Sequence, residues 1–252
     1  MKKIRKILIF VGLILFWEII AQIGIYPETI FPKMSDILFE LFIAFTEKTL
    51  LNTVIYSIII LLKGMIITFI LSFLLVLLSE INIWLNDFLE LLITIAHPLP
   101  GIAIIPLVIL WIGIGENAIL FITVHAMLWP VVVNLKSGIT SINDSYLKMG
   151  KAFNFNFYKK IKHIYFMNLI PNLISGLKIA WARGWRALIS SEMVFGVVGS
   201  TSGLGWYIFE QRVYMNTKGL YAGLFVIIIL GFMIESLVFK KLEKNTVEKW
   251  GI

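Results

Sequence analysis

The long apolar stretches of this chain constrain its fold more than any other feature. A hydrocarbon layer about 30 Å thick is crossed by a helix of about 20 apolar residues. Hydropathy predicts such helices over residues 7–25, 52–78, 88–112, 117–135, 166–195 and 219–239. With 59% hydrophobic and 15% charged residues, the composition excludes an ordinary soluble domain. We therefore predict an all-α polytopic membrane protein with six transmembrane helices, in which residues 1–252 form one domain.

The positive charges predict the orientation of these helices. The chain starts with MKKIRK ahead of an apolar run of about 19 residues, whereas the apolar region of a signal peptide has roughly 7–15 residues. We expect an uncleaved first helix with a cytoplasmic N-terminus. Six spans then put 14 lysines and arginines on the cytoplasmic side and four outside, which agrees with the positive-inside rule. Both termini are therefore predicted to be cytoplasmic.

The third predicted span contains Pro98, Pro100 and Pro106. A proline inside a helix removes a backbone hydrogen bond and kinks the helix. In a membrane, such a break survives only where protein or a water-filled cavity binds the freed carbonyl groups. We therefore expect Pro98 and Pro100 to line a translocation path or a seam between helices. Between the first two spans, the spacing of apolar residues predicts a short amphipathic helix over residues 34–45.

The fifth predicted span carries charged residues, which are costly in a membrane and mark candidate functional sites. Arg183 and Arg186 lie three residues apart on one side of the helix, and their guanidinium groups suit the oxygens of a sulfonate, nitrate or carboxylate. In one interpretation these arginines and Glu192 line the translocation path and the arginines contact an anion. In the other, the arginines pair with Glu192, Glu235 or Glu18 to hold the helices together.

The histidines and tryptophans of the spans are assigned structural roles. His97 and His125 stand alone in apolar helices without the spacing of metal ligands, so we expect satisfied core residues. Trp181 and Trp185 are expected to pack between helices or to anchor the membrane interface.

The sequence contains no recognisable catalytic or metal-binding motif. It lacks the P-loop pattern G-x-x-x-x-G-K-[ST], the H-E-x-x-H zinc motif and a serine nucleophile elbow, and it contains no cysteine. The glycine-rich stretch at residues 196–205 follows a predicted membrane helix rather than a strand, so we expect a flexible connector. We predict a chain with no enzymatic activity, no metal and no cofactor of its own.

The most basic segment is the loop between the fourth and fifth predicted spans, at about residues 140–165. Five lysines lie there with Asp144 as the counter-charge: Lys148, Lys151, Lys159, Lys160 and Lys162. A cationic loop between two spans is expected on the cytoplasmic side. We therefore expect this loop to contact a soluble partner.

This loop resembles the coupling loop in permeases of binding-protein-dependent ABC importers. The family pattern is E-A-A-x-x-x-G, followed by a basic amphipathic helix that ends in proline. Counting back from Pro171 puts Lys148 at the position of the glutamate and Asn154 at that of the glycine. Further blocks resemble the nitrate, sulfonate and taurine branch of the family: Phe31-Pro32, the segment from Pro98 to Glu116, Gly176-Leu177, Ser191-Glu192-Met193 and Gly203-Leu204-Gly205. The resemblance extends from Trp17 to Trp250.

The resemblance implies the fold of a type I importer permease, embedded in the plasma membrane of a prokaryote. Two copies of the chain, as a homodimer, would form one translocation path. Two copies of a separate ATPase would bind ATP and Mg²⁺ on the cytoplasmic side. A lipid-anchored or periplasmic binding protein would deliver the solute from outside, and ATP-driven motion would switch the permease between outward-open and inward-open states.

The resemblance also assigns roles within the coupling loop. A short helix at about residues 145–153 would present Tyr146, Met149, Ala152 and Phe153 to a groove on the ATPase. The lysines around it would act as rim charges that affect orientation more than affinity. The residues expected to take part in coupling are Tyr146, Lys148, Met149, Gly150, Ala152, Phe153, Asn154 and Pro171.

The expected cargo is a small anionic solute such as a sulfonate, nitrate or taurine. Two alternatives stay open. The same architecture could import a thiamine-precursor pyrimidine or another heterocycle. A protein of a different class, a secondary transporter or channel, would work without an ATPase and would carry coupling-ion carboxylates within its spans.

Overall fold

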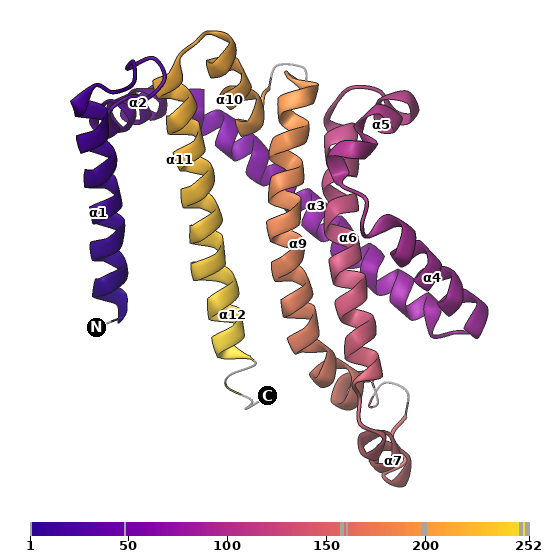
Figure 1. Ribbon diagram of the computed structural model, residues 1–252. Coiled ribbons are helices and arrows are strands. Elements are labelled where there is room, and N and C mark those ends of the chain that lie inside the picture. Colours follow the sequence, from indigo (N-terminus) through magenta and orange to yellow (C-terminus); the bar gives the residue numbers. More distant parts are fainter. Residues whose placement is uncertain are drawn as a thin grey trace. The chain divides into compact units, whose positions relative to one another are not determined.

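The computed structural model describes residues 2–47, 49–156, 159, 161–197, 201–246 and 249. These residues form helices joined by turns and short loops, and none of the described residues lies in an extended strand ladder (Figure 1). The chain divides into two compact units, residues 1–57 with 192–229 and residues 58–191 with 230–252. The prediction of an all-α protein is confirmed for the described residues. The division cuts through three long helices.

The first unit contains the N-terminal helices and the segment around residues 204–229. Its elements are α1 (Lys2–Ile23), α2 (Met34–Thr46), the start of α3 (Thr49–Ser79), α10 (Leu204–Val213) and most of α11 (Thr217–Ile234). Met34 and Ile37 of α2 form a small buried core with Ala222 of α11. The indole N–H of Trp17 donates to the Pro32 carbonyl at 3.0 Å and holds the loop between α1 and α2. The amphipathic helix predicted over residues 34–45 is therefore confirmed as α2.

The second unit contains the remaining helices. Along the chain they are the rest of α3, α4 (Ile83–Ala96), η1 (Gly101–Ile104), α5 (Ile105–Ile112), α6 (Glu116–Thr140), α7 (Asp144–Ala152), η2 (Ile161–Tyr165) and most of α9 (Phe166–Phe195). The last turns of α11, η3 (Glu235–Phe239) and α12 (Lys240–Asn245) complete it. In Figure 1, α6 and α9 run alongside each other and α7 lies beyond the C-terminal end of α6.

Helices α6 and α9 approach each other closely because α9 carries Gly176 where the two helices cross. A Cβ atom at Gly176 would lie 3.0 Å from the Cβ of Asn134 and 3.2 Å from the Cα of Val131. Because one of these neighbours is a backbone atom, a larger residue at position 176 would have to push the two helices apart by a few tenths of an ångström. Small residues at crossings are typical of helix packing in membranes, where close contact replaces the hydrophobic effect.

Two ion pairs connect other helices of the second unit. The Lys136 ammonium of α6 binds Glu90 of α4 at 2.9 Å and also donates to the Asn86 side chain at 2.6 Å. The Lys63 ammonium of α3 binds Glu116 in the first turn of α6 at 2.7 Å. A carboxylate in the first turn also interacts favourably with the helix dipole.

The third predicted span is two helices rather than one kinked helix. The segments Ile83–Ala96 and Gly101–Ile112 are bent by 94° relative to each other. Pro98 and Pro100 lie in the break between them. Pro106 lies in the first turn of α5, where a backbone N–H would have no hydrogen-bond partner within the helix, so that proline does not disrupt it. The expectation of helix-interior prolines was therefore wrong, although the break itself lies where Pro98 and Pro100 occur.

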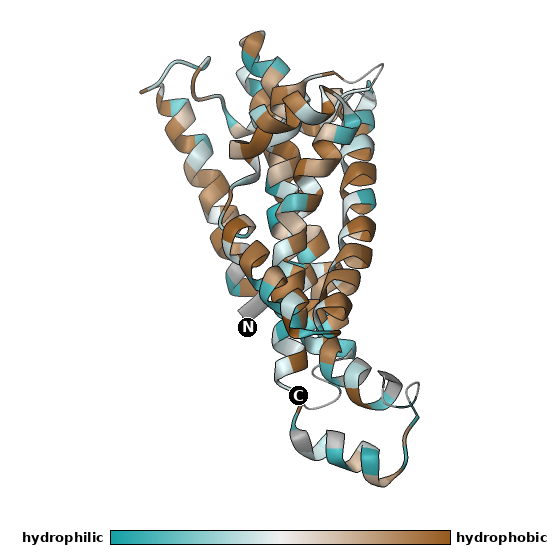
Figure 2. Ribbon diagram, turned by 90° about the vertical axis from the view of Figure 1, so that its right-hand side faces the viewer, coloured by the Kyte–Doolittle hydropathy of each residue, from teal (hydrophilic) through white to brown (hydrophobic). Residues whose placement is uncertain are grey.

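Three helical segments of the described residues are long and apolar enough to cross a membrane, namely Thr49–Ser79, Glu116–Thr140 and Thr217–Asn245. The bent pair adds a fourth if it counts as one span. The apolar part of α1, Leu8–Ile23, is shorter, and α9 has 30 residues but carries four charged side chains. Apolar residues dominate most helix surfaces in Figure 2, as expected for helices that face lipid. The six-span count stays a prediction.

One helix was missed by sequence reasoning. The stretch 196–205 was expected to be a connector, and residues 198–200 within it lie outside the described residues. From Leu204 onward the chain is helical as α10, whose first buried residues are Leu204 and Gly205.

Candidate functional site

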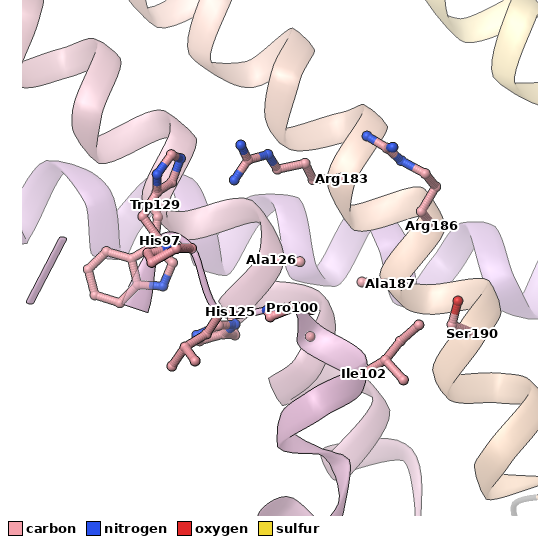
Figure 3. A pocket seen from close by; sticks show the side chains of 13 residues that line it. His97, Pro100, Ile102, His125, Ala126, Trp129, Arg183, Arg186, Ala187 and Ser190 are labelled. Carbon is pink, nitrogen blue, oxygen red and sulfur yellow. The ribbon is translucent and has the colours of Figure 1, made fainter. Parts of the chain in front are cut away.

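The second unit contains a cavity of about 600 Å³ with polar side chains in its wall, which we call the arginine cavity. It is lined by residues 97–102 at the break after α4, by His125 and Trp129 of α6, and by Arg183, Arg186 and Ser190 of α9 (Figure 3). The structure thus brings four of the predicted path residues together: Pro98, Pro100, Arg183 and Arg186. No aspartate or glutamate is among the described lining residues.

The break after α4 shapes the wall of the arginine cavity. His97 keeps helical dihedral angles and donates its N–H to the Ile93 carbonyl at 3.0 Å, whereas Pro98 and Pro100 lack the N–H groups that would continue the helix. Gly101 then lets η1 pack tightly, because a Cβ atom there would lie 3.2 Å from Cγ2 of Ile122 and 3.6 Å from Cβ of Ala187. The local sequence therefore turns the chain across the cavity and presses it against α6 and α9.

The two arginines have no carboxylate partner within the described part of their unit. Arg186 donates from Nε to the carbonyl of Ala182 at 2.9 Å, one turn earlier in α9. In Figure 3 the guanidinium group of Arg183 extends toward the side of the cavity that carries His97 and Trp129. Both guanidinium groups therefore keep donors that are free for a ligand or for water.

The carboxylates proposed as partners for these arginines have other partners. Glu235 lies 4.0 Å from the Lys178 ammonium, which is also bound by Glu243 at 3.2 Å. Glu18 accepts from the hydroxyl of Ser35 at 3.0 Å and from its N–H at 3.1 Å. Among the described residues no ion pair joins these arginines to Glu18, Glu192 or Glu235, and contact of the arginines with an anion stays a prediction.

Glu192 belongs to a buried anchor in the first unit, which we call the Glu192 anchor. Its carboxylate accepts from the Ser57 hydroxyl at 2.7 and 2.9 Å and from the N–H of Gly205 at 2.9 Å. The Ser57 oxygen in turn accepts from the N–H of Leu204 at 2.9 Å. Glu192 and Ser57 are both fully buried. The anchor thus binds the first N–H groups of α10, which have no partner within that helix.

The Glu192 anchor also explains a glycine next to it. A side chain at Gly203 would collide with the Glu192 carboxylate. The sequence blocks around residues 191–193 and 203–205 are therefore halves of one structural site. The predicted role of Glu192 in the translocation path has no support from these contacts and stays a prediction.

A second cavity of about 470 Å³ borders the other side of the same arginines. It is lined by Lys178, Trp181, Trp185, Arg183, Arg186 and Glu235, among others. Trp181 and Trp185 stack with ring centroids 6.2 Å apart and planes 6° from parallel, which agrees with their predicted packing role. Unlike the arginine cavity, this one contains a carboxylate, and its lysine is already paired.

Three residues of the arginine cavity were missed by sequence reasoning. His125 was expected to be a satisfied core residue, but its Nδ1 atom has no hydrogen-bond partner among the described residues. Trp129 is 9% exposed, and its indole N–H is equally unpaired in the described part of the chain. His97 also lines the cavity rather than a closed core. The available signal was the spacing of His125 and Trp129, which puts them one turn apart on α6.

Helix α7 is the candidate coupling site. It confirms the short helix expected at residues 145–153. Tyr146, Met149 and Phe153 form an apolar stripe on it and are 51%, 52% and 69% exposed, whereas Gly150 is buried. Spacings of three and four residues bring the stripe to one side of the helix. Lys148 and Ala152 are also exposed, and Lys160 lies outside the described residues.

The end of α7 explains the residue at position 154. Asn154 has a φ of 49°, in the left-handed region. The N–H of Phe155 donates to the Gly150 carbonyl at 2.8 Å and the N–H of Asn154 to the Lys151 carbonyl at 3.0 Å. This is a Schellman motif, which favours glycine and tolerates asparagine at the left-handed position. Asparagine in place of the family glycine therefore preserves the turn.

Pro171 lies inside a helix rather than at the end of one. The π-helical turn η2 leads directly into α9, and Pro171 is followed by helix as far as Phe195. Asn168 donates from its side chain to the Ile164 carbonyl at 2.6 Å. A side chain can satisfy carbonyl groups at such an irregular turn. A helix that continues past Pro171 agrees with the helix predicted over residues 166–195 and differs from the family pattern, in which the basic helix ends in proline.

Comparison with known proteins identifies similar chains. The family described as "Binding-protein-dependent transport system inner membrane component" matches residues 70–246, more than half of the chain. The chain is 25% identical over 169 residues to the putative aliphatic sulfonates transport permease protein SsuC of Bacillus subtilis (strain 168), covering 67% of this chain and 58% of the relative.

Two further relatives differ in how much of their length is matched. The chain is 25% identical over 147 residues to the taurine transport system permease protein TauC of Escherichia coli (strain K12), covering 58% of this chain and 52% of the relative. It is 24% identical over 243 residues to the formylaminopyrimidine transport permease protein ThiX of Halalkalibacterium halodurans, covering 96% and 94%. The matches span just over half the length of the sulfonate and taurine relatives.

Proposed function

Because this chain belongs to the family of binding-protein-dependent transport system inner membrane components, we propose that it is the membrane-embedded subunit of an ATP-driven importer. In our proposal the chain is a permease of the sulfonate and taurine type, and it works with an ATPase and a binding protein. ATP and Mg²⁺ bind to the separate ATPase subunits, and this chain contributes no catalytic group. Two copies of the chain form the path, with six spans each and both termini in the cytoplasm.

The observation that carries the coupling role is the exposed apolar stripe of α7. Tyr146, Met149 and Phe153 are all at least half exposed, on a helix flanked by basic residues. An amphipathic helix of this kind fits a hydrophobic groove on a partner protein. The N-terminus of α7 is fastened by the Asn143 side chain, which accepts from the N–H of Ser145 at 2.9 Å. Both ends of the helix are therefore held, so that it can transmit motion as a rigid element.

The solute in our proposal is a small anion. The arginine cavity carries two guanidinium groups and no carboxylate among its described residues. Charged groups within a membrane protein mark substrate pathways when they face a cavity, and a guanidinium group matches the oxygens of sulfonate or nitrate. Alternating exposure of this cavity to the two sides of the membrane would carry the anion inward.

A second candidate cargo is a neutral pyrimidine, as in the formylaminopyrimidine relative. That relative is matched over 94% of its length, far more than the sulfonate and taurine relatives. The stacking surfaces of Trp181 and Trp185 in the second cavity would suit an aromatic ring. Competition by sulfonates and by pyrimidines for uptake of the same labelled solute distinguishes the two cargoes.

The test of the proposal is uptake by the purified permease in liposomes that contain its cognate ATPase and binding protein. We expect uptake only with ATP and Mg²⁺, and none with a non-hydrolysable ATP analogue. Uptake driven by an ion gradient in the absence of ATPase would support a secondary transporter and contradict the proposal.

A further inference from the structure

We propose that the arginine cavity is a selectivity site for an oxyanion head group, in which Arg183 supplies the charge and Trp129 and His125 supply hydrogen bonds. This inference rests on the proposed import of an anion and names the residues that recognise it. Its probes are methanesulfonate and nitrate, each a singly charged group with three oxygens. Neither Trp129 nor His125 was a site residue on the basis of sequence.

The unpaired donors are the first line of support. A buried polar group without a partner costs about 1–3 kcal/mol, and native proteins leave few such groups unsatisfied. The indole N–H of Trp129 and Nδ1 of His125 have no partner among the described residues, and both side chains line the same cavity. An indole nitrogen can only donate, so the missing partner of Trp129 is an acceptor such as an anionic oxygen.

The charge around the cavity is the second line of support. The guanidinium groups of Arg183 and Arg186 line it, and no described lining residue can bear a negative charge. The second cavity contains the same arginines but also Glu235, and its Lys178 is paired with Glu243 at 3.2 Å. An anion is therefore favoured in the arginine cavity over its neighbour.

The directions of approach are the third line of support. Trp129 and His125 come from α6, whereas Arg183 comes from α9, and all three line the arginine cavity (Figure 3). Donors that converge from two helices can contact different oxygens of one head group. Their fixed positions also explain selectivity, because a neutral solute would leave both the guanidinium charge and the indole donor without a partner.

The chain contains no cysteine, which makes a single-cysteine experiment direct. Ser190 lines the cavity and does not act as a ligand in the proposal. In the Ser190→Cys variant, reaction rates with sulfonatoethyl and trimethylammonioethyl methanethiosulfonate report the charge selectivity of the cavity. Each rate is divided by the rate of the same reagent with free mercaptoethanol, which removes intrinsic reactivity.

We expect the anionic reagent to react faster than the cationic one. Adding Arg183→Gln should lower the anionic-to-cationic ratio by about tenfold or more, since one nearby charge acts on the two reagents in opposite directions. Arg183→Lys should retain most of the ratio because it keeps the charge. The matched control is Arg212→Gln, an exposed arginine of α10 in the first unit, which should leave the ratio unchanged.

The hydrogen-bond ligands are tested by protection of the same thiol. Methanesulfonate or nitrate should slow labelling, and Trp129→Phe should raise the concentration for half protection by about tenfold, as expected for loss of a hydrogen bond to a charged group. Trp185→Phe removes another unpaired indole N–H, but one that borders the second cavity. We expect no change in half protection with Trp185→Phe.

Several outcomes would overturn the inference. They are an unreactive thiol, a ratio that does not respond to Arg183→Gln, and equal effects of Trp129→Phe and Trp185→Phe. None of them depends on ATP, so they are distinguishable from failure of the proposed function. ATP-dependent uptake with no charge selectivity at residue 190 would refute this site alone, whereas charge selectivity with ATP-independent uptake would refute the importer instead.

Discussion

The Glu192 anchor predicts a large and specific loss of stability when its carboxylate is removed. Glu192 is 0% exposed and accepts from the Ser57 hydroxyl and the Gly205 N–H. In Glu192→Ala both donors lose their acceptor, and each unpaired buried donor costs about 1–3 kcal/mol. The space left behind adds a cavity penalty of about 1 kcal/mol or more. The expected loss is therefore about 3–7 kcal/mol, a large share of the roughly 5–15 kcal/mol that stabilises a typical domain.

Milder substitutions in the Glu192 anchor should destabilise the protein less than Glu192→Ala. Glu192→Gln keeps the volume of the side chain and one acceptor oxygen but replaces the other oxygen with an NH₂ group that cannot accept, so we expect a loss of about 1–2 kcal/mol. Ser57→Ala removes the hydroxyl that bridges Glu192 and the N–H of Leu204. We expect a loss of about 2 kcal/mol for this change, because it leaves one N–H unpaired.

The assay is equilibrium unfolding of the purified permease in mixed micelles, with proteolysis near residues 196–205 as a local readout for release of α10. Glu80→Ala, which removes an exposed carboxylate at the end of α3, is the matched control and should stay within about 0.5 kcal/mol of the parent. The double variant of Ser57 and Glu192 should lose less than the sum of the single changes, because the two side chains are in contact. Additive losses, or an Ala variant as stable as the parent, would refute the anchor.

Three further predictions concern other parts of the chain. Phe153→Asp should weaken ATPase binding by about tenfold or more in a pull-down, since the apolar side chain, 69% exposed in this chain, would no longer be buried in the groove of the partner. The control Lys148→Gln makes the same change in net charge and should weaken binding less than threefold. Equal effects of the two changes would contradict docking by the stripe. Asn154→Gly should preserve α7. Asn154→Val should lower stability by about 1–2 kcal/mol, because the φ of 49° at position 154 disfavours a β-branched residue. Equal stability of the two variants in thermal unfolding would contradict this reasoning. Hydrogen bonds with Glu28 and with the Lys218 ammonium hold the pKa of Asp36 below its ordinary value of 3.8. The ionised Asp36 therefore stabilises the fold above pH 3.8, and this stabilisation is lost as the pH falls below that value. Asp36→Asn should flatten the acid side of the plot of melting temperature against pH, and an unchanged acid side would exclude this contribution.

Properties of consecutive residues were predictable from the sequence. The apolar runs and their lengths indicated a helical membrane protein because a helix satisfies its own backbone in lipid. Spacings of three and four residues located α2 and the stripe on α7. The prolines at 98 and 100 located the break after α4, although the 94° bend was not predictable from them. The separated sequence blocks also indicated the correct family.

Only the tertiary structure decided which side chains share a site. Ser57 and Glu192 are 135 residues apart in the sequence and make one hydrogen-bonded anchor, and no local pattern connects them. The arginines were recognisable as unusual from their place in a span, yet whether they pair with a carboxylate or face a cavity depends on residues from other helices. His125 and Trp129 became candidates for the same reason, since an unpaired donor is defined by the absence of a neighbour and not by its own sequence position. Local backbone preference acts between adjacent residues and can be read along the chain, whereas burial and pairing arise only when distant segments meet.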